Sequence, residues 1–288
     1  MTSSTTIEPT PKAPAHGSNS AIRGGVPADL KVTQLRVIKS EWLKFRSLRS
    51  SYYSLIAAVV CMIGFGCLFA AVTAARWSDF RPAERANFDP TSVSLRGFFL
   101  VQLIVGVLGV LVVTGEYSTG MIRSSLSAAP HRLPVLWAKA IVFALVTFVV
   151  TTVSAFIAFF AGQAILSSQH LETTLSAPGV LRAVIGTGLY LTVVGLLGVA
   201  LGWVVRHTAG AIATLFGLLL ILPALAEALP TDWQQNISKY LPNNAGEAVF
   251  SIVRAPDELA PWAGFGVFCA YLVAGIVAAV VLLKRRDA

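Results

Sequence analysis

Charged residues are scarce in this chain of 288 residues, and their scarcity excludes an ordinary soluble domain. Asp, Glu, Lys and Arg make up 12% of the sequence, against roughly a quarter in soluble proteins. Hydrophobic residues make up 55%, and the mean hydropathy is +0.72. So few polar side chains cannot cover the surface of a soluble core of this size. The composition therefore predicts a membrane protein.

Cysteine is nearly absent. Cys61, Cys67 and Cys269 all lie inside apolar runs. They lack the spacing of metal ligands, and their odd number gives no disulfide framework. We interpret them as small buried hydrophobic residues, and we predict no metal site and no cofactor on this chain.

Catalytic and nucleotide-binding motifs are missing as well. The sequence has no G-x-x-x-x-G-K-[ST] phosphate loop, no H-E-x-x-H and no G-x-S-x-G. These absences disfavour ATP binding on this chain, an intramembrane metalloprotease and a lipase-like enzyme. The central parts of the long apolar runs carry no charged residue or histidine, which disfavours an ion-coupled transporter or a proton pump. We therefore predict no catalytic residues, and any energy for transport would have to come from outside the chain.

Long apolar runs are what the sequence has in abundance. Six of them come close to, or exceed, the roughly 20 residues needed to cross a bilayer. They cover residues 52–75, 97–114, 135–166, 183–205, 209–229 and 262–283. Pro223 is expected to kink the fifth run. The predicted fold class is an all-α membrane protein, with six transmembrane helices in a domain over residues 51–288.

The segment before the first run divides into two parts. Residues 1–28 are rich in Ser, Thr, Pro, Ala and Gly, a composition that predicts a disordered cytoplasmic tail. Over residues 29–50, hydrophobic side chains recur at steps of three or four, and basic residues take most of the remaining surface. The hydrophobic positions are Val32, Leu35, Ile38, Trp42 and Phe45. This pattern predicts an amphipathic interfacial helix, lying in the lipid headgroups or packed on a partner protein there.

The segment between the fifth and sixth runs, residues 230–261, mixes aromatic and aliphatic residues with polar ones. We expect it to form short helices on the outer surface or to dip back into the membrane. A re-entrant backbone is tolerated only where protein or water satisfies its polar groups.

Basic residues predict the orientation of the spans. With the amino terminus inside, cytoplasmic segments hold fifteen of the 22 basic residues and only five of the 14 acidic ones. Both termini are therefore expected to be cytoplasmic. The net charge of +8 then reflects topology and contact with anionic lipid, so no nucleic-acid partner is expected.

The most informative motif follows the second run and reads Gly115-Glu116-Tyr117-Ser118-Thr119-Gly120-Met121-Ile122-Arg123. It sets one acidic residue directly at the cytoplasmic end of an apolar run. It resembles the E-Y-x-x-G-[TM]-[IL]-R sequence of the ABC-2-type transporter permease family. The segment 40–47 before the first run, which contains Glu41 and Trp42, is similar to that of actinobacterial members.

This resemblance implies a permease subunit of an ATP-binding-cassette transporter in the cytoplasmic (inner) membrane of a bacterium. It implies a second permease copy or paralogue and a separate ATPase subunit, on which ATP and Mg would bind. The residues to which it assigns coupling with the ATPase are Glu41, Trp42, Glu116, Tyr117, Thr119, Gly120 and Arg123.

Three of these residues also have an individual physical interpretation. Glu116 suits an ion pair with a basic residue of the preceding amphipathic helix or of the partner; its simpler interpretation is an interfacial acid or a helix cap. Gly120 is expected to permit a tight turn or a close approach. Arg123 is interpreted either as a coupling residue or as a contact to lipid phosphate.

Features inside the runs are weaker candidates. The resemblance favours the second and fifth runs at the dimer interface, which singles out Gln102 and Thr214 for a substrate path. Most hydroxyls in such runs bond to their own helix backbone. Gly195, Gly198 and Gly202 form a small-residue face that predicts close helix packing.

Two other functions are compatible with the sequence. One is a non-transporting membrane scaffold that docks a cytoplasmic partner, which needs no path through the membrane. The other is a secondary transporter, which the uncharged centres of the runs disfavour.

Overall fold

The computed structural model describes residues 34–118, 120, 133–228, 230, 234, 236–253 and 258–285. Over these residues the regular structure is helical, with no strand. Six helices are long and apolar enough to cross a membrane, which confirms the predicted all-α membrane protein with six spans. The tail predicted over residues 1–28 lies outside the described residues.

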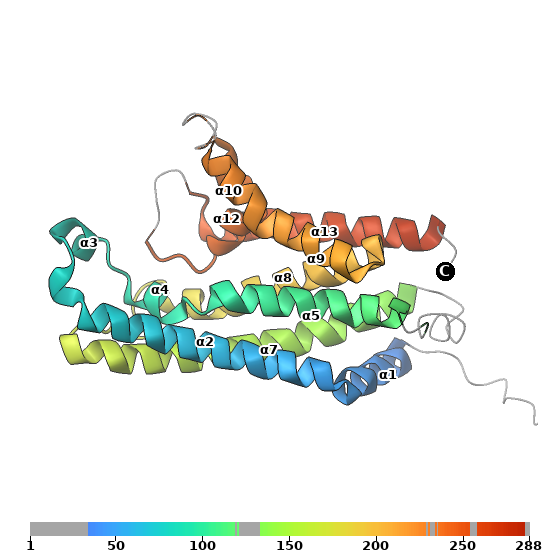
Figure 1. Ribbon diagram of the computed structural model, residues 1–288, viewed down its shortest axis with the longest axis horizontal. Coiled ribbons are helices and arrows are strands. Elements are labelled where there is room, and N and C mark those ends of the chain that lie inside the picture. Colours follow the sequence, from blue (N-terminus) through green and yellow to red (C-terminus); the bar gives the residue numbers. More distant parts are fainter. Residues whose placement is uncertain are drawn as a thin grey trace, which may run out of the picture. The chain divides into compact units, whose positions relative to one another are not determined.

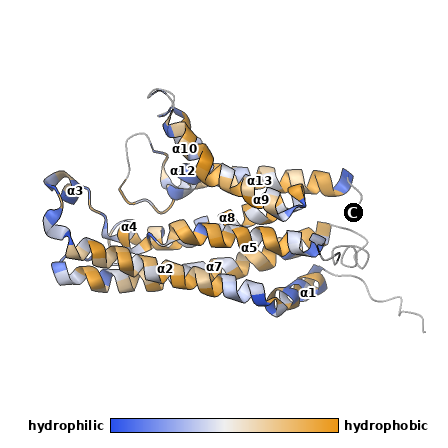
Figure 2. Ribbon diagram, viewed as in Figure 1, coloured by the Kyte–Doolittle hydropathy of each residue, from blue (hydrophilic) through white to orange (hydrophobic). Residues whose placement is uncertain are grey.

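Each predicted apolar run corresponds to one helical span (Figure 1). In chain order the spans are α2 (Arg49–Ala75), α4 with α5 (Pro90–Leu95 and Phe98–Ser118), α7 (Leu133–Leu166), α8 (Val180–Val205), α9 with η3 and α10 (Thr208–Phe216, Gly217–Ile221 and Leu222–Glu227), and α13 (Pro261–Arg285). The other elements are α1 (Gln34–Ser47), η1 (Trp77–Asp79), α3 (Pro82–Ala86), η2 (Ser167–Gln169), η4 (Ser238–Tyr240) and α12 (Pro242–Glu247). Figure 2 shows hydrophobic residues along the spans and hydrophilic ones gathered on α1 and α3.

Helix α8 is the centre of the packing. It contacts α5, α7 and α13, and 78% of its most apolar stretch is buried, against 17% for α13. Glycines allow α5 and α8 to approach closely, because a Cβ atom at Gly109 would overlap the carbonyl of Gly195, and one at Gly198 would overlap the carbonyl of Gly106. The close packing predicted for the glycine face of α8 is therefore confirmed, and it serves contacts within the chain.

The fifth span is irregular where the sequence predicts a kink. Pro223 has no N–H group to bond to the carbonyl four residues earlier, and its ring crowds that carbonyl. A π-helical turn, η3 (Gly217–Ile221), precedes it, and the chain changes direction between α9 and α10 (Figure 1). The disturbance thus begins at Gly217, six residues before the proline.

The segment between the fifth and sixth spans contains short helices, as predicted. Helix α12 packs against α13 and α8, and Gly246 allows this because a Cβ atom there would lie 2.7 Å from the Tyr190 ring. The Arg182 guanidinium of α8 donates to the carbonyls of Val249, at 2.6 Å, and Ser251, at 2.9 Å. These contacts fix the segment to the ends of the spans.

Helix α1 packs on α7 through one face. Its buried residues are Val37, Glu41 and Phe45. Of the hydrophobic face predicted from the sequence, Phe45 is buried, whereas Leu35 is 77% exposed and Trp42 is 43% exposed. The helix therefore turns a mixed polar and apolar face to the protein and keeps part of its apolar face outside.

Candidate functional site

Four charged side chains meet where α1 lies against the ends of α5 and α7. Lys139 of α7 donates to Glu41 Oε2 of α1 and to Glu116 Oε1 of α5, both at 2.8 Å. Lys44 of α1 donates to Glu41 Oε1 at 2.7 Å and lies 3.6 Å from Glu116 Oε1. We call these four residues the ion cluster.

The ion cluster is largely shielded from water. The side chains of Lys139 and Glu41 are each 4% exposed, that of Glu116 is 12% exposed, and that of Lys44 is 29% exposed. Two positive and two negative charges compensate each other. Away from water their attraction is stronger than on a surface, and removal of one member would leave an uncompensated buried charge. The cluster therefore makes the position of α1 depend on the positions of α5 and α7.

The pairing keeps the α1 members charged. Burial by itself raises the pKa of Glu41, but the charges and hydrogen bonds of Lys139 and Lys44 outweigh it and lower the pKa below its ordinary value. Burial by itself lowers the pKa of Lys44, but Glu41 and Glu116 outweigh it and raise the pKa. Both residues therefore carry their charges across the neutral pH range.

The location of Glu116 shows why it needs cationic neighbours. It lies in the last turn of α5, where the helix dipole presents partial negative charge and disfavours a carboxylate. Lys139 and Lys44 offset that effect with contacts from two other helices. The ion pair expected between Glu116 and a basic residue of the preceding amphipathic helix is confirmed at Lys44.

An aromatic contact lies beside the ion cluster. The Tyr117 ring meets the Trp203 ring edge to face, with 5.9 Å between their centroids, and the Arg206 guanidinium lies 5.4 Å above the Tyr117 ring. Arg206 ends α8 in the left-handed region, at φ 57°. These contacts hold the end of α5 against the turn between α8 and α9.

The other motif residues are less closely involved. Gly120 has φ +71°, a conformation that favours glycine, which agrees with the expected turn. Trp42 lies on the exposed side of α1, outside the ion cluster. Thr119 and Arg123 lie outside the described residues. Coupling of these residues to an ATPase stays a prediction.

Sequence reasoning missed the central member of the cluster. The orientation argument includes Lys139 only as one of the fifteen basic residues expected on the cytoplasmic side, although it is the one charged residue in the 34 residues of α7. A lone charge within an otherwise apolar span needs a partner inside the protein. That signal marks Lys139 as a member of a buried site, although it does not identify the partners.

The two candidates for a substrate path differ in location. Gln102 is fully buried between spans of this chain, and its Oε1 accepts a hydrogen bond from Tyr190 at 2.5 Å. Thr214 is exposed on α9, and its hydroxyl donates to the Gly210 carbonyl at 2.8 Å. The expectation that such hydroxyls bond to their own backbone is confirmed at Thr214.

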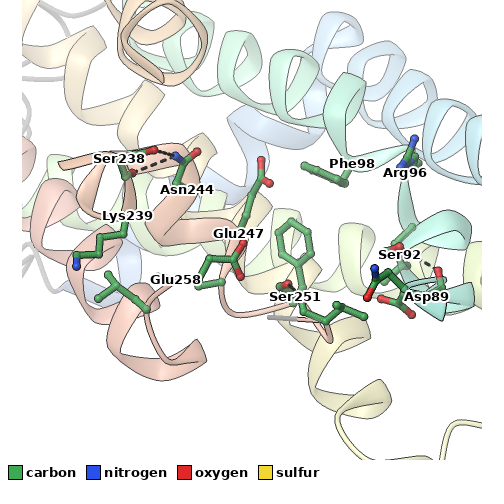
Figure 3. A pocket seen from close by; sticks show the side chains of 16 residues that line it. Asp89, Ser92, Arg96, Phe98, Ser238, Lys239, Asn244, Glu247, Ser251 and Glu258 are labelled. Atoms are coloured by element: carbon green, nitrogen blue, oxygen red, sulfur yellow. Dashed lines mark hydrogen bonds between the residues drawn. The ribbon is translucent and has the colours of Figure 1, made fainter. Parts of the chain in front are cut away.

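Two cavities lie outside the ion cluster. An apolar groove of about 520 Å³ lies between α1, α2 and α7. A polar pocket of about 500 Å³ lies at the opposite end of the spans, between the start of α5 and the segment containing α12 (Figure 3). Within the described ranges, no group of three or more His, Cys, Asp or Glu residues is placed to hold a metal ion.

Most of the chain matches a known family. A family model described as "ABC-2 family transporter protein" matches residues 37–224, more than half of the chain. The match includes all four residues of the ion cluster. No curated protein matches the chain.

Proposed function

The chain belongs to the ABC-2 transporter family and is a multi-pass membrane permease, and on this basis we propose that ATP hydrolysed by a separate subunit drives its transport. ATP and Mg bind to that subunit, and a second permease copy or paralogue completes the transporter. The family match supports association with an ATP-binding subunit in general terms. The ion cluster and the exposed side of α1 support coupling to a separate ATPase subunit.

The ion cluster is the observation that carries the proposal. It joins α1, which lies outside the spans, to the ends of two spans through buried charge pairs. A force applied to α1 or to the segment after Glu116 is therefore transmitted to α5 and α7. A subunit that changes shape on nucleotide binding needs a connection of this kind.

The exposed side of α1 is the proposed docking surface for the ATPase. Trp42 and Leu43 are 43% and 57% exposed there, one and two positions after the buried Glu41. An exposed aromatic side chain beside an aliphatic one is typical of the anchors at protein interfaces.

Orientation follows from the basic residues. We propose that both termini and the ion cluster face the cytoplasm of a bacterial cell, because fifteen of the 22 basic residues then lie inside. The cluster is then on the side where ATP is available, and the polar pocket opens on the outer side.

Co-purification tests the proposal directly. The full chain, expressed with its neighbouring genes and affinity-purified from membranes, should recover a soluble ATPase subunit. Membranes that hold the chain alone should hydrolyse no ATP. Substrate-stimulated ATP hydrolysis by the reconstituted complex would support a permease over a scaffold. Stable recovery of the chain without an ATPase, or uptake driven by an ion gradient alone, would contradict the proposal.

A further inference from the structure

The polar pocket lies far from the ion cluster. Its walls include Arg96 and Phe98 at the start of α5, whereas Glu116 lies at the end of that helix. At 1.5 Å per residue, α5 separates the two by about 30 Å. The pocket has a volume of about 500 Å³, which suits a small organic molecule.

Among the described residues of the pocket wall, acidic groups outnumber basic ones by three to two. The acidic residues are Asp89, Glu247 and Glu258, and the basic ones are Arg96 and Lys239. Both cations lie over aromatic rings, Arg96 at 5.5 Å from the Phe69 centroid and Lys239 at 5.6 Å from that of Tyr240. The pocket therefore favours a positively charged occupant.

Glu247 is the carboxylate in the best position to meet such an occupant. Figure 3 shows its side chain in the middle of the pocket, with Phe98 beyond the carboxylate. Asp89, by contrast, is engaged in capping α4, where its carboxylate accepts from the backbone N–H of Thr91 at 2.9 Å. Glu247 accepts from Asn243 Nδ2 at 2.7 Å.

We propose that the polar pocket binds an organic ammonium ion, with Glu247 as the counter-charge and with Phe98 and Phe250 as aromatic contacts. Both rings line the pocket, edge to face with centroids 4.8 Å apart, and aromatic rings attract organic cations. A hard metal ion requires more oxygen ligands than the described residues bring together. This inference deepens the proposed transport function, on which it rests, by naming a substrate class.

The ionisation of Glu247 agrees with this role. Burial, assisted by the charge of Glu258 and opposed by the hydrogen bond from Asn243, raises the pKa of Glu247 to about 7. The other charged or titratable groups around it are Asp89, Arg96, Tyr190 and Lys239. A cation favours the ionised carboxylate, so its binding below neutral pH releases the proton of Glu247.

A chain of hydrogen bonds connects Glu247 with the interior of the spans. Tyr190 Oη lies 2.8 Å from Asn243 Oδ1 and 2.5 Å from Gln102 Oε1. A hydroxyl group donates only one hydrogen bond. Tyr190 therefore donates to one of these two oxygens at a time, and the chain leads from Glu247 through Asn243 and Tyr190 to Gln102 of α5.

Binding of choline to the full chain in lipid nanodiscs, without ATP or a partner subunit, tests the site. Calorimetric titration should show choline binding and no binding of its neutral isostere 3,3-dimethylbutanol. The affinity should be about tenfold higher at pH 8 than at pH 6, as the ionised fraction of a group with a pKa of about 7 changes by that factor. Buffers of different ionisation enthalpy should reveal proton release at pH 6.

Variants distinguish this site from non-specific attraction. Glu247→Gln should abolish choline binding. Phe250→Leu should weaken choline binding several-fold, while the pH dependence persists. Glu172→Gln is the control, because Glu172 is an exposed acid outside the pocket, and it should leave choline binding unchanged. Thermal melting confirms that each variant is folded. Equal binding of the neutral isostere, or choline binding by Glu247→Gln at the parent's affinity, would overturn the inference. Choline binding without a co-purifying ATPase would leave the site intact and contradict only the proposed transport mechanism.

Discussion

Lys139 and Glu41 lie 98 positions apart in the sequence and form an ion pair of 2.8 Å in which each side chain is only 4% exposed. One comes from the second turn of a long apolar span and the other from a helix outside the spans. The pair therefore determines how α1 sits on the protein, and its loss has consequences that can be measured.

Removal of the Lys139 charge should destabilise the protein. In Lys139→Met the carboxylates of Glu41 and Glu116 lose their shared buried partner, which typically costs about 3–5 kcal/mol. Thermal unfolding in detergent should show a clearly lower midpoint. Lys39→Met, at an exposed position on α1, is the matched control and should change the midpoint little. Equal midpoints for both variants would show that the ion cluster contributes no stability.

Truncation on the exposed side of α1 should weaken ATPase binding without loss of stability. Trp42→Ala together with Leu43→Ala removes two exposed hydrophobic side chains, and interface anchors of this kind contribute about 2 kcal/mol each. Co-purification of the ATPase should fall more than tenfold while the unfolding midpoint is kept. Val273→Ala, at a 58% exposed position on α13, is the control. Full recovery of the ATPase with the double variant would place the docking surface elsewhere.

Acid should weaken the ion cluster through Glu41. Its pKa is lowered in the folded protein, so the stability that it contributes is present above the ordinary value of 4.5. That stability is lost as the pH falls below 4.5 and through the lowered pKa. When the pH is lowered from 7, the melting temperature of the parent protein should begin to decrease at about pH 5. In Glu41→Gln this part of the decrease should disappear, and an unchanged acid profile would contradict the assignment.

Close packing of α5 on α8 should make Gly198 intolerant of a side chain. In Gly198→Ala the added methyl group overlaps the Gly106 carbonyl, and relief requires the two helices to separate, at a cost of about 1–3 kcal/mol. Gly64→Ala is the control, because a Cβ atom there meets no neighbour within 4 Å and alanine favours the helix by about 1 kcal/mol. The two variants should therefore shift the unfolding midpoint in opposite directions.

The sequence by itself determined the six spans. A bilayer admits only segments that are apolar and that satisfy their own backbone hydrogen bonds, so hydropathy and length are enough to place helices. The motif at Glu116 likewise indicated the family, because it is a local pattern that survives without knowledge of the fold. The proline-induced disturbance of the fifth span and the glycine face of α8 are local in the same sense.

The tertiary structure alone decided which side chains meet. A span such as α7, apolar on all sides, gives no periodicity from which its rotation can be inferred, so the pairing of Lys139 with Glu41 could not be predicted. The same holds for the polar pocket, where Glu247 and Phe98 come from elements far apart in the sequence. Long-range pairing depends on helix rotation and on close packing at glycines, and these are properties of the assembled helices.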